Sequence, residues 1–227
     1  MDLSLEDLVP INETTNLGNS SLTFDGLLPE PGLQVVEDGG AAGCGGKLWP
    51  AGELLSKYMI RRGLKGAKNI VELGSGTGLV GLAIGLDQRR LGNDDFTVWI
   101  TDQENMMPLM EENVTLNQLT TVKAAVLNWG DELPEYAKSA DLVLAADCVY
   151  LEAAFPLLEK TLLDLTENGT PILLCYKKRR RADSKFFKKI KKNFVVTEIK
   201  DHEDYEHYFR QAVYLYEFTR KTNNSNQ

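Results

Sequence analysis

The chain has 227 residues, 43% of them apolar, and a formal net charge of −8. This length suits one α/β domain with a sizeable core, and no run approaches the ~18 apolar residues of a membrane helix. With two histidines and three cysteines (Cys44, Cys148 and Cys175), we expect neither a metal site nor a disulfide framework, which suits a reducing compartment. The acidic N-terminus lacks a signal-peptide layout. We therefore expect a cytoplasmic, monomeric protein.

The two ends of the chain differ from its middle. Residues 1–46 are predicted to be an N-terminal extension packed on the main domain, because three prolines and the stretch "EDGGAAGCGGK" interrupt any long helix. Within this extension, 22–26 and 33–38 are expected to pair as a hairpin across "LLPEPG". Residues 220–227, "RKTNNSNQ", are predicted to be a polar tail.

Between these ends, over residues 47–219, hydrophobic patterns of helix and strand alternate. Helices are predicted over 51–62, 78–90, 107–117, 155–169 and 182–193. Strands are predicted over 69–73, 96–102, 121–127, 140–147, 171–176, 194–199 and 212–218. No full helix fits between the last two strands, so they are expected to form an antiparallel pair. The alternation predicts an α/β fold, a doubly wound seven-stranded sheet with helices on both faces.

Several chemically informative residues follow predicted strands. Gly74, Asp102, Asp147 and Tyr176 each lie at or just beyond a carboxyl end. Ligands of doubly wound sheets bind beyond these ends, at the point where the strand order reverses. We therefore expect these residues to gather around one site.

The stretch "ELGSGTGLVG" fits two cofactor loops, E-x-G-x-G-x-G and the dinucleotide pattern G-x-G-x-x-G. Both interpretations need Gly74, Gly76 and Gly78 for a sharp turn and for close approach of a ligand. Asp102 can accept ribose hydroxyls in either case. A dinucleotide places a pyrophosphate at the helix N-terminus, whereas Glu72 adds negative charge that suits a cation. The loop therefore favours S-adenosylmethionine, which carries a sulfonium, over a nicotinamide cofactor.

The second informative stretch is "DCVY", which follows the apolar strand over 140–147. Asp147 can hold an incoming amine through a charge-assisted hydrogen bond, and the ring of Tyr150 can add a cation–π contact. Methylases of nucleic-acid amines carry two prolines inside this motif, whereas this chain has Cys148 and Val149. A protein-lysine methyltransferase is therefore favoured. An RNA or DNA N-methyltransferase is the alternative, and a non-catalytic donor-binding module is a third hypothesis.

Five stretches together resemble the seven-β-strand protein-lysine methyltransferases, methyltransferase family 16: "GGKLWPAGELL", "ELGSGTGLVGLAIG", "WITD", "NWG" and "LVLAADCVYLEAAFPLLEKTL". The resemblance covers residues 44–218 and implies a Rossmann-like class I fold. It is strongest to members that modify a lysine of translation elongation factor 1A, which implies this protein as the substrate. Asp147 and Tyr150 match the family's catalytic D-x-x-Y motif. The family's positions that contact the methyl donor match Trp49, Gly74, Ser75, Gly76, Asp102, Trp129 and Ala146.

For two of these positions, the side chain and its place in the sequence also suggest a role. The ring of Trp129, between a strand and Gly130, can cover a face of the adenine. Trp49 opens the first predicted helix and can close the methionine end of the site. For each, packing in the core is the competing interpretation.

A basic segment, "KKRRRADSKFFKKIKK" at 177–192, holds ten of the 25 basic residues and one of the 33 acidic ones. The acidic remainder disfavours nucleic acid as a substrate. We expect either a solvated helix face or a docking patch for an acidic protein or ribonucleoprotein surface. In both cases the apolar side chains should face inward, at Phe186, Phe187, Ile190 and Phe194.

Overall fold

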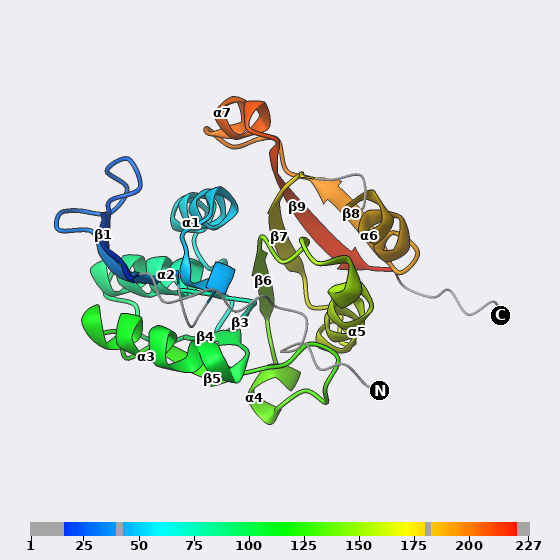
Figure 1. Ribbon diagram of the computed structural model, residues 1–227, viewed down its shortest axis with the longest axis horizontal. Coiled ribbons are helices and arrows are strands. Elements are labelled where there is room, and N and C mark those ends of the chain that lie inside the picture. Colours follow the sequence, from blue (N-terminus) through cyan, green and yellow to red (C-terminus); the bar gives the residue numbers. More distant parts are fainter. Residues whose placement is uncertain (1–15, 40–42, 180–182, 222–227) are drawn as a thin grey trace.

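The structure, a computed structural model, describes residues 16–39, 43–179 and 183–221. A seven-stranded sheet forms its centre, in the order β5-β4-β3-β6-β7-β9-β8 (Figure 1). The strands are β3 (Asn69–Leu73), β4 (Thr97–Asp102), β5 (Val122–Val126), β6 (Leu142–Ala146), β7 (Ile172–Lys177), β8 (Phe194–Glu198) and β9 (Val213–Arg220). All pairings are parallel except those of β9, which runs antiparallel to β7 and β8. The predicted sheet and its C-terminal antiparallel pair are confirmed.

Helices cover both faces of the sheet (Figure 1). One face carries α1 (Pro50–Arg62), α2 (Leu79–Arg90) and α3 (Met107–Leu116). The opposite face carries α4 (Glu135–Lys138), α5 (Phe155–Leu165) and α6 (Asp183–Ile190). A short helix, α7 (Tyr205–Arg210), packs against β9, and 3-10 turns occur at η2 (Gly43–Gly46), η3 (Glu104–Met106) and η4 (Glu152–Ala154).

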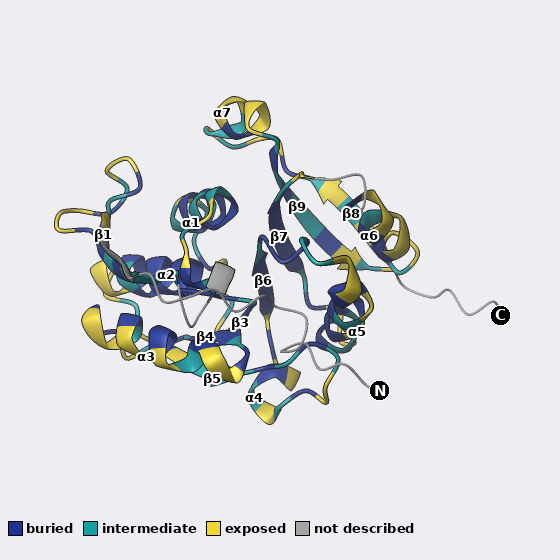
Figure 2. Ribbon diagram, in the orientation of Figure 1, coloured by how far each residue is buried: buried dark blue, intermediate teal, exposed yellow. Residues whose placement is uncertain are grey.

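Strand β6 shows why the sheet sits between two hydrophobic cores. Leu142 and Leu144 pack into the core under α1–α3, and Val143 and Ala145 pack into the core under α5 and α6. Each of these four side chains is at most 1% exposed. Figure 2 accordingly shows β6 in the colour of buried residues. A strand buried on both faces must be apolar throughout, which is the pattern that predicted it.

The N-terminal hairpin exists, but its first strand differs from the prediction. Strand β1 (Asn16–Leu22) pairs with β2 (Leu33–Asp38), whereas residues 24–27 form a turn. Phe24 and Asp25 have positive φ there. Asp-Gly is a turn signal, and in "LTFDG" it outweighs the apolar start of the segment.

Further differences concern short elements and the end of the chain. Helix α4 was not predicted, and α7 occupies the connection judged too short for a full helix. Strand β9 continues to Arg220, so the predicted tail starts one residue inside the strand. Residues 222–227 of that tail lie outside the described part of the chain, as do 1–15 of the predicted extension. Within the described residues, no helix combines the length and apolar character needed to cross a membrane.

Asn113 of α3 and Asn117, the residue that follows this helix, attach the hairpin to the main domain. Asn113 Oδ1 accepts the Val36 N–H at 2.7 Å, and Asn117 Oδ1 accepts the Gln34 N–H at 3.0 Å. Their amide nitrogens donate back to the carbonyls of the same two residues. These two side chains thus satisfy backbone groups on the free edge of β2.

Candidate active site

A cavity of about 300 Å³ opens beyond the carboxyl ends of β3, β4 and β6. Its position is the point where the strand order reverses, because β4 and β6 flank β3 on opposite sides. Its volume is at the lower end of the range usual for small-molecule sites. The predicted site residues that line it are Trp49, Glu72, Gly74, Ser75, Gly76, Asp102, Trp129, Ala146, Asp147 and Tyr150.

The glycine loop after β3 is constrained by the chain itself. Gly74 and Gly76 both have a φ of +57°. A Cβ on Gly74 would lie 2.9 Å from the Trp129 ring, and one on Gly76 would lie 2.4 Å from the Gly45 carbonyl oxygen. Close approach of a ligand, the reason predicted for these glycines, is therefore not needed to explain them, because protein atoms already exclude a side chain.

Two residues expected at the site lie elsewhere. Gly78 precedes α2 with a φ of +83°, and a Cβ there would meet Ile100 at 2.7 Å, so this glycine serves helix packing and does not line the cavity. Tyr176 is buried under α6, where its ring packs 4.8 Å from that of Phe187, and burial raises its pKa. Its position at the end of β7 reflects the core and not the site.

Glu72 lines the cavity, but its predicted role as a negative charge needs correction. The carboxyl group is fully buried, and Oε2 accepts the Gly81 N–H at 2.8 Å. Desolvation raises the pKa of Glu72 to about 8, with a smaller contribution from the nearby Asp102 charge. Burial therefore favours the protonated, neutral form of Glu72 in the ligand-free chain, which weakens the argument for a permanent anion beside the loop.

Asp102 ties the end of β4 to the glycine loop. Its Oδ2 accepts the Gly76 N–H and its Oδ1 accepts the Gln103 N–H, both at 2.8 Å. A carboxylate offers about four acceptor positions, so each oxygen keeps capacity for a further donor. Burial raises the pKa of Asp102, whereas the two backbone hydrogen bonds lower it. The residue can thus hold the loop and accept a ligand hydroxyl together.

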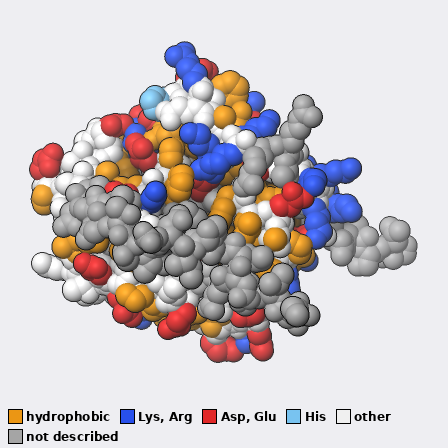
Figure 3. Space-filling view, viewed as in Figure 1, with side chains coloured by type: hydrophobic (Ala, Val, Ile, Leu, Met, Phe, Trp, Pro, Cys, Tyr) orange, Lys and Arg blue, Asp and Glu red, His pale blue; other side chains and the backbone are white. Residues whose placement is uncertain are grey.

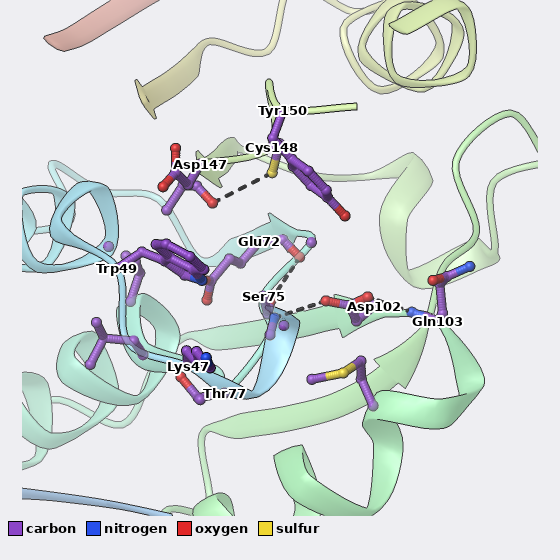
Figure 4. Close-up of a pocket in the computed structure, with 18 of the residues that line it drawn as sticks. Lys47, Trp49, Glu72, Ser75, Thr77, Asp102, Gln103, Asp147, Cys148 and Tyr150 are labelled. Atoms are coloured by element: carbon purple, nitrogen blue, oxygen red, sulfur yellow. Dashed lines mark hydrogen bonds between the residues drawn. The ribbon is translucent and has the colours of Figure 1, made fainter. Parts of the chain in front are cut away.

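Gln103 is a cavity residue that the sequence did not single out. Its side chain is 93% buried, and among the described residues its Nε2 donor has no hydrogen-bond partner. A buried amide without an acceptor is costly, so a ligand acceptor in the cavity would satisfy it. Figure 4 shows Asp102 and Gln103 on the side of the cavity opposite Asp147 and Tyr150. These groups fit the adenosine portion of S-adenosylmethionine: a carboxylate that can accept from hydroxyls, an amide nitrogen without a partner among the described residues, and an aromatic ring.

The two tryptophans occupy different depths. Trp129 is 8% exposed and packs against Gly74, so its ring forms part of the cavity wall. Trp49, immediately before α1, is 37% exposed and lies at the rim. The two rings can therefore bound the inner and outer parts of a ligand.

Asp147 sits in a sharp turn after β6, with a φ of 59° that is uncommon for residues other than glycine. Its N–H donates to the Cys175 carbonyl at 2.8 Å, and its Oδ1 accepts the Lys177 N–H at 3.1 Å. Its side chain is 7% exposed and forms a bidentate pair with Arg179. Arg179 also lines the cavity, and the sequence analysis placed it only in the basic segment.

Residues 183–190 of the basic segment form the amphipathic helix α6, as predicted. Phe186, Ile190 and Phe194 are at most 2% exposed, and Phe187 packs on neighbouring aromatic rings. The outward lysines gather on the side of the molecule that carries α6 (Figure 3). Two of them pair with acidic residues of the same chain, in Lys185–Glu152 and Lys189–Glu159. Arg180 and Arg181 lie outside the described residues, and docking by this helix stays a prediction.

A family model described as lysine methyltransferase matches residues 27–193. The chain is 47% identical to protein-lysine N-methyltransferase EFM6 of Saccharomyces cerevisiae, over 95% of this chain and 96% of that protein. It is 31% identical to EEF1A lysine methyltransferase 3 of Xenopus tropicalis, over 84% and 82% of the two chains. Among solved structures, the S-adenosylmethionine-dependent methyltransferase SibL aligns with a TM-score of 0.52 at 12% identity, over 69% of this chain and 51% of that one.

Proposed function

This chain belongs to the lysine methyltransferase family, and from that premise we propose that it methylates a lysine of translation elongation factor 1A. The matching family is described as lysine methyltransferase and the yeast relative as a protein-lysine N-methyltransferase, which supports a protein substrate over the nucleic-acid alternative. The choice of elongation factor 1A is supported by the motif resemblance and by the name of the Xenopus relative.

We assign the cofactor to the part of the cavity between the glycine loop and β4. Asp102 would accept the ribose hydroxyls, Gln103 would donate to an adenine or ribose acceptor, and Trp129 would cover the base. Ser75, Ala146 and Trp49 complete this wall. When bound, S-adenosylmethionine supplies a methyl group activated by its sulfonium.

Asp147 and Tyr150 would receive the substrate lysine at the opposite wall. The carboxylate of Asp147 can bind an ammonium by a charge-assisted hydrogen bond, and Tyr150 can offer its ring face. Lysine has a solution pKa of ~10.4, so the amine must lose its proton before it attacks. Desolvation inside the cavity favours the neutral amine. Asp147 then acts mainly by holding the nitrogen in line for attack.

The observation that carries this proposal is that the D-x-x-Y pair and the glycine loop line one cavity. The test is to incubate the protein with radiolabelled S-adenosylmethionine, once with purified elongation factor 1A and once with a cell extract with and without nuclease, and to locate the modified lysine by mass spectrometry. We expect label on elongation factor 1A that survives nuclease. Label on other proteins only would remove the assigned substrate, and label lost with nuclease would contradict protein methylation.

Asp147→Asn tests the catalytic assignment. We expect kcat/KM to fall by about 100-fold or more, because the amide keeps the shape but loses the charge that positions the amine. Binding of S-adenosylhomocysteine should stay within about tenfold, or ~1.4 kcal/mol. Asp87→Asn is a matched control, since Asp87 is also buried and paired with an arginine, away from the cavity. A variant of Asp147 that retains activity would remove this residue from the mechanism.

A further inference from the structure

The carboxylate assigned to the substrate lysine already holds a cation. Arg179 Nη1 donates to Asp147 Oδ1 at 2.7 Å, and Nη2 donates to Oδ2 at 2.5 Å. The guanidinium carbon lies 5.2 Å from the centre of the Trp49 ring. The Arg179 and Asp147 side chains are 29% and 7% exposed, so the pair is largely shielded from water. Arg179 thus has both the carboxylate and an aromatic contact within the cavity.

We propose that Arg179 is an internal occupant of the lysine subsite, which the substrate lysine must displace before methyl transfer. The inference rests on the proposed function, because it takes Asp147 as the group that receives the lysine. Both oxygens of Asp147 accept from the guanidinium. An incoming ammonium needs the same oxygens and would be repelled by the guanidinium beside it. The two cations therefore compete for one carboxylate.

A role for Arg179 in positioning Asp147 is less well supported by the contacts. The backbone of β7 already holds Asp147 in place. The Asp147 N–H donates to the Cys175 carbonyl, and Asp147 Oδ1 accepts the Lys177 N–H. Both contacts are independent of the arginine side chain. Removing Arg179 should therefore free the carboxylate without disturbing its turn.

An arginine is suited to occupy the lysine subsite because its side chain is not itself a nucleophile for the methyl group. Its guanidinium remains charged at any physiological pH and offers no free lone pair, whereas a lysine can lose its proton and become a nucleophile. A bidentate fork also binds a carboxylate with two hydrogen bonds in a fixed geometry. A lone lysine side chain competes poorly with this fork, so contacts elsewhere on a docked protein must contribute to opening. Arg179 would in this way favour a folded protein substrate over free lysine.

This arrangement has a measurable consequence. When only a fraction of molecules has an open subsite, the apparent dissociation constant equals the intrinsic one divided by that fraction. In Arg179→Gln every molecule is open. We expect the dissociation constant of elongation factor 1A for the S-adenosylhomocysteine-loaded enzyme, measured by calorimetry, to fall by about fivefold or more. KM should fall by the same factor, and kcat should stay within about twofold. Arg179→Lys, which keeps the charge but loses the fork, should show a smaller decrease.

Arg90→Gln is the matched control, because Arg90 pairs at 2.7 Å with the buried Asp87 on α2 and should leave all three constants unchanged. A fall in kcat without a change in KM in Arg179→Gln would assign the residue to positioning and overturn the inference. Unchanged constants would also overturn it, while leaving the proposed function intact if the wild type methylates elongation factor 1A. If the wild type transfers no methyl group to that protein, both proposals fail. Should Arg179→Gln not fold, Arg179→Lys gives the deciding comparison.

Discussion

The protonation of Glu72 makes the stability of the fold depend on pH. Its pKa rises from 4.5 to about 8 in the folded chain because the group is buried. Between these values the folded chain retains a proton that the unfolded chain has released. The contribution of Glu72 to the free energy of unfolding is therefore fully present below pH 4.5 and is lost as the pH rises through about 8.

Glu72→Gln removes this titration while keeping a neutral side chain of the same shape. We expect the stability of the variant relative to the wild type to increase as the pH rises from about 5 to about 8. Urea denaturation across this range measures the difference. Glu112→Gln, at an exposed position of α3, should show no such trend. A difference between Glu72→Gln and wild type that does not vary with pH would contradict the burial effect.

Single residues also show how far the sequence can locate a site. Asp147, Tyr150 and the glycines were found because each belongs to a short motif whose spacing is local. The pairing of Arg179 with Asp147 spans 32 positions and depends on how β7 ends beside β6. Likewise, that Gln103 Nε2 has no partner in the described part of the chain becomes apparent only when its surroundings are known. Contacts of this kind are determined by the fold and leave no pattern among residues adjacent in the sequence.

At the scale of elements, long apolar strands and helices were predicted well, because burial on one or both faces imposes a period on the sequence. The bounds of β3 match the prediction at both ends, and those of α6 fall within the predicted range. Elements without such a period were not predicted. The four residues of α4 span barely one turn, and β1 begins in the polar stretch "NLGNSSL". Their formation depends on neighbours and not on a pattern of their own.

The attachment of the hairpin gives a prediction for α3. Asn113 is fully buried and bonds to both backbone groups of Val36 and to the Thr77 carbonyl at 3.0 Å. Asn113→Ala should lower the free energy of unfolding by about 3 kcal/mol, because one buried and two partly buried backbone groups lose their partner. Thr115→Ala, at an exposed position of the same helix, should change it by less than about 0.5 kcal/mol.

Hydrogen exchange distinguishes local detachment from general weakening. In Asn113→Ala the Val36 amide should exchange faster than in the wild type, because its acceptor is gone. The amides of the central strand β3 should remain the more protected ones. A variant as stable as the wild type, with Val36 still protected, would show that the hairpin is held by its apolar contacts alone.

For the whole molecule, a ligand that binds only the folded chain must raise its thermal stability. At 100 times the dissociation constant this stabilisation is about 2.7 kcal/mol. In a chain of this size, that corresponds to a rise in Tm of roughly 5–10 °C. We expect S-adenosylmethionine and S-adenosylhomocysteine to produce this shift in differential scanning fluorimetry, and NADH at the same concentration to produce none.

The same measurement separates the two parts of the cavity. Asp102→Asn should reduce the shift produced by S-adenosylhomocysteine, because Asp102 both holds the Gly76 amide and faces the assigned ribose position. Arg179→Gln should retain most of the shift, because Arg179 pairs with Asp147 of the lysine subsite and contacts the cofactor wall only through the ring of Trp49. Equal loss in both variants would mean that the cofactor and lysine subsites are not separate. A shift with NADH alone would reassign the glycine loop to a dinucleotide, and with it the chemistry of the whole cavity.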